Sequence, residues 1–251
     1  MTVETVLMLL VAGLLGGMAN AMAGGATLVT FPAMMAAGLP AISANASNTV
    51  AVVFGNVMGA WAERRLLPLF DGTMLIACAS AIAGGAAGAV LLLNTPEKVF
   101  VLVVPALIGI ATVIFAFSKP IQIWIGKIFG VNSGGLRAAL VFPSTIYGGY
   151  FGAGLGVILM SVLSATSVWE LRSVNAVKNI LGVLANAAAI VIFVVRGVIS
   201  WPETLTMMSA CIVGGFLGGK ALAVISAATM RKAIIVIGCA MTLFYAWRYW
   251  A

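Results

Sequence analysis

The chain has 251 residues, of which 63% are hydrophobic and 8% are charged, and its formal net charge is +7. A soluble domain carries about 25% charged residues, so this sequence has too few polar side chains to cover a water-facing surface. The long uncharged runs predict an all-α polytopic membrane protein. A transmembrane barrel is excluded because it needs short alternating segments, and the apolar runs here are continuous.

The first half of the chain divides into four long apolar segments and one short one. The first span, about 3–22, ends like a signal peptide, but no basic residue precedes it and a counterpart recurs near 136–150. A short apolar piece at 26–37 follows, and it is too short to cross a bilayer. Longer segments are expected at about 44–62, 73–93 and 98–118.

The second half repeats this order. With a shift of 130 residues and no gap, Asn45 meets Asn175, Asn56 meets Asn186, and a Gly-Gly-x-x-Gly motif recurs. Apolar composition gives chance matches between Ala, Val and Ile, but it does not give paired asparagines, so the match predicts a duplication. The repeated segments are expected at about 135–152, 156–168, 174–195, 203–225 and 230–248.

These segments predict two homologous halves, 1–118 and 135–251, joined by a short basic linker at 119–134. Together they would contain about eight to ten membrane helices, including one short broken helix in each half. Whether the halves are parallel or inverted depends on whether the short piece counts as a crossing. We expect inverted repeats, because short glycine-bounded pieces at matching places in two halves are typical of that architecture.

Basic residues gather on the cytoplasmic side of membrane proteins, but here their number does not decide the topology. With four crossings in each half, one side of the membrane carries three cations, Lys98, Arg231 and Lys232. The other side carries seven, Arg64, Arg65, Lys119, Lys127, Arg137, Arg196 and Arg248. With five crossings in each half, the three are Lys98, Arg196 and Arg248. The seven are then Arg64, Arg65, Lys119, Lys127, Arg137, Arg231 and Lys232. Both alternatives divide the cations seven against three.

Two kinds of glycine cluster occur. The motifs that begin at Gly84 and Gly214 have the spacing that lets two helix backbones approach closely, so we interpret them as packing surfaces. Other glycines begin the two short pieces, where they permit a tight break and expose backbone N–H groups at a helix N-terminus. Such an end binds anions, and the candidate residues are Gly24, Gly25, Gly154 and Gly156.

Amide side chains form a stripe in each half. On a helix, Asn175, Asn179 and Asn186 fall within about 40° of one another, and Asn45, Thr49 and Asn56 repeat the pattern. Buried amides can simply join helices, and we interpret Asn56 and Asn186 in this way. The residues nearer the short pieces are expected to bind a ligand, and they are Asn45, Asn48, Thr49, Asn175 and Asn179.

Lys178 is the most informative charge, because it lies only a few residues inside an apolar span. Such a lysine either extends to the interface or lines a polar cavity. Its counterpart in the first half is Asn48, and both an ammonium and an amide can donate hydrogen bonds to a small oxyanion. Arg172 either adds positive potential to this site or marks the interface with Glu170.

Other chemistry finds no support in the sequence. Histidine is absent, and the carboxylates fall near the ends of the predicted spans, so we expect no catalytic residue, metal site or cofactor. The basic residues flank apolar spans rather than form a patch, so no nucleic-acid partner is expected.

The residues also resemble a known family. "GLLGGMANAMAGGATLVTFPAMMAAGLP" followed by "SANASN", and "YGGYFGAGLGVILMSVL" followed by "RSVNAVKN", are similar to the two-part motif of the sulfite exporter TauE/SafE family, also called TSUP. The sequence departs from that pattern at Ala26, where another glycine often stands. The resemblance implies transport of small sulfur-containing anions, such as sulfite, sulfoacetate or other sulfonates, across the bacterial inner (plasma) membrane.

The sequence therefore predicts a multi-pass anion carrier, acting as an exporter, with its site between the two halves. An inside-negative potential of 100 mV favours outward movement of one negative charge by about 2.3 kcal/mol, so export needs no partner ion. A channel-like anion pore and an importer of a related oxyanion remain alternatives. The expected partners are the anion and the lipid bilayer, and the small-residue faces are compatible with a homodimer.

Overall fold

The computed structural model describes residues 1–23, 25–129, 134–221 and 227–250, and these residues form helices without any strand. The helices of the first half are α1 (Val3–Ala23), α2 (Thr27–Ala36), α3 (Ala41–Ala62), η1 (Arg64–Leu66), α4 (Gly72–Asn94), α5 (Glu97–Ala116) and α6 (Ser118–Phe129). The helices of the second half are α7 (Gly134–Tyr150), α8 (Leu155–Thr166), α9 (Leu171–Val195), α10 (Trp201–Ala221) and α11 (Ala227–Trp250). An all-helical chain fits a bilayer, because a helix satisfies its backbone polar groups internally.

Within the described residues, five helices are long and apolar enough to cross a membrane, namely α1, α4, α5, α9 and α11. The apolar helices α2 and α8 have 10 and 12 residues and are too short to cross. Helix α3 has 22 residues but is not among the five, because its asparagines and serines lower its mean hydropathy. The chain is therefore a multi-pass membrane protein, and its helices fall close to the predicted segments. The predicted linker contains most of α6.

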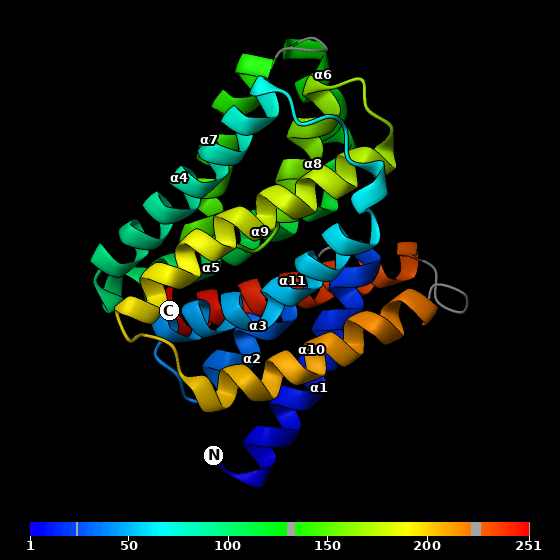
Figure 1. Ribbon diagram of the computed structural model, residues 1–251. Helices are drawn as coiled ribbons and strands as arrows, with labels where there is room; N and C mark the ends of the chain where they lie inside the picture. Colours follow the sequence, from blue (N-terminus) through cyan, green and yellow to red (C-terminus); the bar gives the residue numbers. More distant parts are fainter. Residues whose placement is uncertain (24, 130–133, 222–226, 251) are drawn as a thin grey trace.

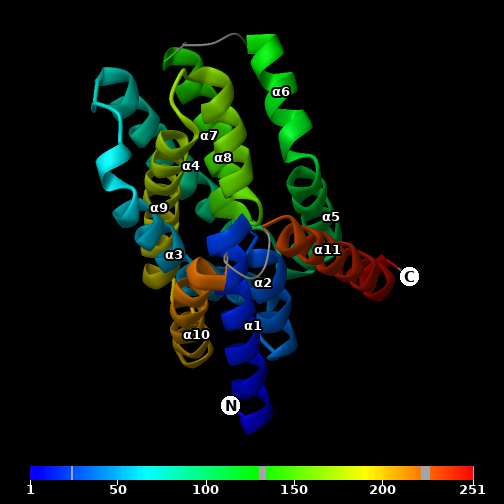
Figure 2. The same ribbon diagram turned by 90° about the vertical axis from the view of Figure 1, so that its right-hand side faces the viewer.

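Figures 1 and 2 show how helices from the two halves are interleaved. Helix α1 packs along α10, α4 packs along α7, and α3 lies against α9. The Gly-Gly-x-x-Gly motifs make the first two contacts possible. A Cβ atom at Gly88 would come closer than 3.0 Å to the carbonyl oxygen of Ile146, and one at Gly214 would do the same to that of Leu14. Both motifs therefore serve helix packing, as the sequence predicts.

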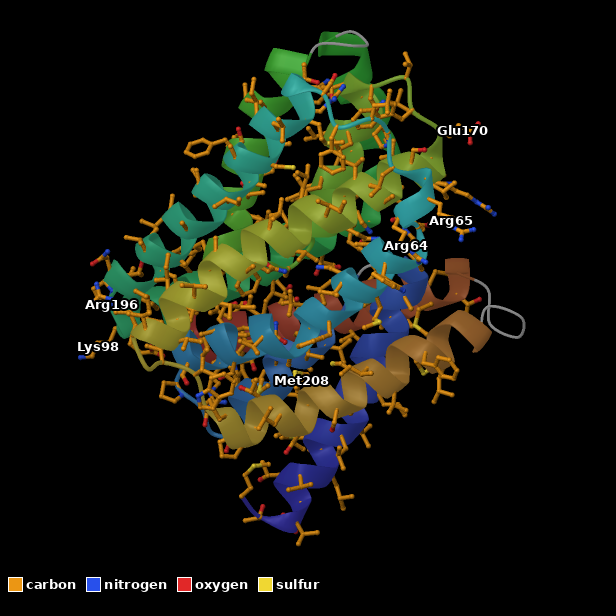
Figure 3. All side chains as sticks on the ribbon, viewed as in Figure 1. Arg64, Arg65, Lys98, Glu170, Arg196 and Met208 are labelled. Atoms are coloured by element: carbon orange, nitrogen blue, oxygen red, sulfur yellow. The ribbon has the colours of Figure 1, made fainter. Side chains whose placement is uncertain are left out.

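Several basic residues lie at two opposite ends of the molecule. Figure 3 shows Lys98 and Arg196 at one end, with Arg64 and Arg65 at the other. Arg231 Nη2 donates to Ser118 Oγ at 2.6 Å, next to Lys119. The indole of Trp250, two residues after Arg248, donates to the carbonyl of Leu102 in α5, which begins one residue before Lys98.

Three arginines separate the two topologies that the sequence leaves open, and they are Arg196, Arg231 and Arg248. Arg196 and the end of α11 lie with Lys98, whereas Arg231 lies beside Ser118 and Lys119. These positions match the division of cations expected for five segments in each half, with α2 and α8 counted as segments, and the number of membrane crossings stays a prediction.

The short helix α8 is held at its C-terminal end by buried Arg137 of α7, which is 3% exposed. Arg137 Nη2 donates to the carbonyl of Thr166 at 3.1 Å, and the guanidinium lies 4.2 Å from the ring centroid of Trp169. Nearby, Asp71 caps α4 by accepting from the Met74 N–H at 2.8 Å. This bond and a second one from the Thr73 hydroxyl lower the pKa of the Asp71 carboxyl.

Candidate functional site

A polar cavity with two lobes lies where α1, α3, α8 and α9 meet. The outer lobe has a volume of about 340 Å³ and the inner lobe about 50 Å³. Four residues line both lobes, namely Asn20, Asn56, Gly156 and Lys178. The outer lobe also reaches Ser118 and the exposed Lys119 at the start of α6, so it opens at the end of the molecule that carries Arg231.

Lys178 is the cation at the junction of the two lobes. It comes from α9, two turns into the helix, between Asn175 and Asn179. Its ammonium forms no hydrogen bond or ion pair with any residue that the structure describes, although it lies near enough to Glu63 for electrostatic attraction. A charge taken out of water without a close partner is costly, so this site favours an anion in the cavity.

Amide side chains surround the cavity because glycines on neighbouring helices make room for them. Asn20 lies over Gly55, and Asn179 lies over Gly59, where a Cβ atom would come 2.5 Å from Asn179 Nδ2. Gly55 and Gly59 are one turn apart on α3, so a single helix face accommodates both amides. Each amide nitrogen offers two donors, which suits an oxyanion.

The inner lobe is bounded by the N-terminal ends of both short helices. It is lined by Ala26 and Thr27 from α2, and by Gly154, Leu155 and Gly156 from α8. The backbone N–H of Gly156 has no backbone acceptor within the described ranges. The N-terminus of a helix carries partial positive charge, so both ends favour an anion between them.

The break before α8 depends on glycine. Gly152 and Gly154 both have φ of +79°, a left-handed conformation that other residues adopt only with strain. The hydroxyl of Tyr147 donates to the carbonyl of Ala153 at 2.8 Å and fixes the turn between them. These features aim the first turn of α8 at the cavity.

Several predicted site residues lie at this cavity. Asn175 and Asn179 line the outer lobe, Thr49 and Gly154 line the inner lobe, and Lys178 and Gly156 line both. Asn175 Nδ2 also donates to Glu63 Oε2 at 2.6 Å.

Other predicted residues lie elsewhere. Asn45 and Asn48 are each 1% exposed and are not among the described residues that line either lobe. Asn45 Nδ2 donates to the carbonyl of Tyr150 at 3.0 Å, so this amide joins α3 to α7. Gly25 is buried beside Ile234, and the Arg172 side chain is exposed. Gly24 lies outside the described residues.

Three asparagines that the sequence does not assign to the site also line the cavity. The sequence places Asn20 in a segment that ends like a signal peptide and predicts packing roles for Asn56 and Asn186, whereas the structure places all three at the cavity. A polar side chain inside an apolar span was a signal for Asn20, because such residues commonly face a cavity. The sequence predicts only a topology signal at Lys119, whereas the structure places it at the outer lobe.

A family model described as "Sulfite exporter TauE/SafE" matches residues 9–245. A "Probable membrane transporter protein" of Haemophilus influenzae is 24% identical over 249 residues, which are 96% of this chain and 94% of that protein. "Probable membrane transporter protein YfcA" of Escherichia coli K12 is 22% identical over 237 residues, 91% of this chain and 85% of that protein.

A third relative, "Probable membrane transporter protein ORF9" of a Sinorhizobium species, is 23% identical over 235 residues, 94% of this chain and 90% of that protein. No solved structure matches the chain at a comparable level of significance. The similarity to the family model and to these relatives extends over nearly the whole chain, so it includes every helix that contributes to the cavity.

Proposed function

Because this chain belongs to the sulfite exporter TauE/SafE family of membrane transporters, we propose that it exports a small sulfur-containing anion across the bacterial inner membrane. The substrate class would be sulfite, sulfoacetate or another organosulfonate. The anion would bind at the junction of the two lobes, between the side chains of Lys178, Asn20 and Asn56.

The observation that carries this proposal is the ammonium of Lys178, which lies in a polar cavity without a close counter-ion among the described residues. A bound anion would neutralise this charge, and the surrounding amides and the N–H of Gly156 would supply further hydrogen bonds. The inner lobe, at about 50 Å³, suits one small oxyanion group, and the outer lobe offers a passage to it.

The distribution of cations supports the direction. If the end that carries Lys119 and Arg231 is cytoplasmic, the outer lobe opens to the cytoplasm through Ser118 and Lys119. The anion would then enter from the side on which the membrane potential is negative. Outward movement of one negative charge is favoured by about 2.3 kcal/mol for each 100 mV.

The opposite end carries the contacts that would have to open for release. Ser43 Oγ donates to the carbonyl of Val198 at 2.7 Å, and the N–H of Ser200 donates to Ser47 Oγ at 3.0 Å. The carboxylate of Glu97 accepts from the N–H of Ala41 at the start of α3. In an alternating-access cycle of two inverted halves, these bonds would break while the cytoplasmic end closes.

The proposal is tested by anion efflux from proteoliposomes that contain the purified protein, with sulfite and a panel of sulfonates. We expect efflux above that of protein-free liposomes, and its absence for every anion would contradict the proposal. A carrier also shows faster exchange when unlabelled anion is present on the far side, whereas a pore does not, so counterflow separates these two alternatives. Anion flux is also compared under an inward and an outward anion gradient, with membrane potentials of opposite sign. Equal rates would show that import and export are equally accessible, which would contradict a preferred outward direction.

A further inference from the structure

Glu63 is a carboxylate in a hollow that adjoins the cavity in which the anion is proposed to bind, and a negative charge is unexpected there. It directly follows α3 and is half-buried. With Asn175 and Gly59 it lines a hollow of about 440 Å³. Asn175 and Gly59 also line the outer lobe, so the hollow and the lobe adjoin. Because Glu63 bonds Asn175, which lines the outer lobe, its charge lies near an anion held in that lobe.

Glu63 faces Asn175 rather than a cation. Its Oε2 accepts a hydrogen bond from Asn175 Nδ2 at 2.6 Å. The adjacent Arg64 is turned away, because Arg64 Nη1 donates to the carbonyl of Trp61 at 2.8 Å and its guanidinium stacks 4.3 Å from the Trp61 ring centroid. Across the described part of the chain, no cation lies within ion-pair distance of the Glu63 carboxylate.

Helix stability does not explain this carboxylate. Glu63 occupies the C-terminal end of α3, where the helix dipole is negative and a carboxylate is unfavourable. Its hydrogen-bond partner, Asn175, is three positions before Lys178 on α9, so the two side chains are neighbours on one helix face. The negative charge is therefore held about one helical turn from the ammonium that would bind the substrate.

A fixed charge at this position acts on an anion in proportion to the anion's own charge. Coulomb's law makes the repulsion of a doubly charged anion by Glu63 twice that of a singly charged anion at the same place. The attraction by Lys178 scales in the same way, so Glu63 reduces the net preference of the site for higher charge. The hydrogen bond from Asn175 holds the Glu63 carboxylate at this position, from which it repels the anion.

We propose that Glu63 is a specificity-determining residue that shifts the preference of the site toward singly charged oxyanions, such as monosulfonates and hydrogen sulfite, and away from doubly charged ones such as sulfate. This inference rests on the proposed function and narrows its substrate class. Glu63 need not touch the anion, because it acts through its charge.

The test is the binding of two anions to the purified full-length protein at constant ionic strength, before and after Glu63→Gln. Methanesulfonate carries one negative charge and sulfate carries two, and the apparent Kd of each is followed by intrinsic fluorescence or by a thermal shift. The glutamine keeps an oxygen that accepts from Asn175. We expect the Kd for methanesulfonate to fall about threefold and that for sulfate about ninefold, the square of the first factor.

Two control variants separate charge from shape. Asn175→Ala removes the hydrogen bond without changing the formal charge. Glu170→Gln removes a carboxylate from the same end of the molecule (Figure 3). Glu170→Gln should leave the ratio of the two Kd values unchanged. Asn175→Ala should change this ratio less than Glu63→Gln does.

The possible outcomes are distinct. Equal factors for the two anions in Glu63→Gln, or no change in either Kd, would overturn the role of Glu63 while the proposed function stands. Absence of binding and of flux in the unaltered protein, for every anion of the sulfonate panel, would overturn the proposed function and the role of Glu63 together.

Discussion

The side-chain amide of Asn20 in α1 lies directly over Gly55 in α3, closer than a Cβ atom at position 55 would allow. Asn179 lies in the same way over Gly59, one turn further along α3. Both amides line the outer lobe around Lys178. The polar lining of the cavity therefore depends on glycines that carry no polar group themselves.

Gly55→Ala should displace the Asn20 amide and weaken anion binding. Loss of one hydrogen bond to a charged ligand corresponds to about 1.5 kcal/mol, or roughly a tenfold higher Kd. The measurement is the Kd for methanesulfonate, with thermal unfolding as a check that the protein is folded. Gly72→Ala is the matched control, since no atom lies within 4 Å of its added Cβ. An unchanged Kd in Gly55→Ala would show that Asn20 does not contribute to binding.

Asn56→Asp should abolish most anion binding without changing the size of the side chain. Asn56 lines both lobes, so the substitution places a negative charge beside Lys178 and against the incoming anion. Repulsion at this distance in a partly dry site raises the Kd by about tenfold or more. Asn94→Asp, at the exposed end of α4, is the control. Equal anion affinity in the two variants would place the binding site away from Asn56.

Gly88→Ala should destabilise the contact between α4 and α7. The added Cβ would collide with the carbonyl oxygen of Ile146, which is backbone and cannot move aside easily. Overpacking of this kind costs about 1–3 kcal/mol. Thermal unfolding in detergent measures the effect, and Gly135→Ala, with open space around its Cβ, should leave the unfolding temperature nearly unchanged.

Gly154→Ala should destabilise the protein for a different reason. The added Cβ would meet only ordinary contacts, at 3.7 Å from the backbone of Ala111, but the backbone φ of +79° is strained for alanine. The expected cost is about 1–2 kcal/mol. Gly156→Ala provides the comparison, because its Cβ would lie 3.8 Å from Lys178 Cδ and its φ is not left-handed. Similar unfolding temperatures for the two variants would refute the role of φ.

The sequence predicts the helices well because hydropathy and glycine punctuation are local signals. The short pieces predicted at 26–37 and 156–168 correspond to α2 and α8, and Gly154 begins the second of them as expected. The sequence indicates Lys178 as a site residue because a single charge inside an apolar span usually lies at a functional site. The duplication and the inverted arrangement stay predictions, although the packing of α1 on α10 and of α4 on α7 is compatible with them.

The choice among asparagines could not be made from the sequence. Asn45 and Asn56 share one predicted helix face, yet Asn45 donates to Tyr150 of α7 while Asn56 lines the cavity. The difference depends on which helices lie opposite each turn of α3, and that is set by long-range packing. The sequence could not assign Glu63 to the site for the same reason, because its partner Asn175 is 112 positions away.

The central claim is that Lys178 binds the transported anion, and sulfite efflux from proteoliposomes that contain Lys178→Met tests it most directly. Methionine keeps an unbranched side chain but removes the ammonium, so the cavity should persist without its charge. The control is Lys98→Met, because Lys98 lies at the end of the molecule opposite Arg64 and Arg65 (Figure 3). We predict that Lys98→Met retains efflux, whereas Lys178→Met falls to the level of protein-free liposomes while its unfolding temperature shows a folded protein. Efflux from Lys178→Met at the rate of the unaltered protein would contradict the account.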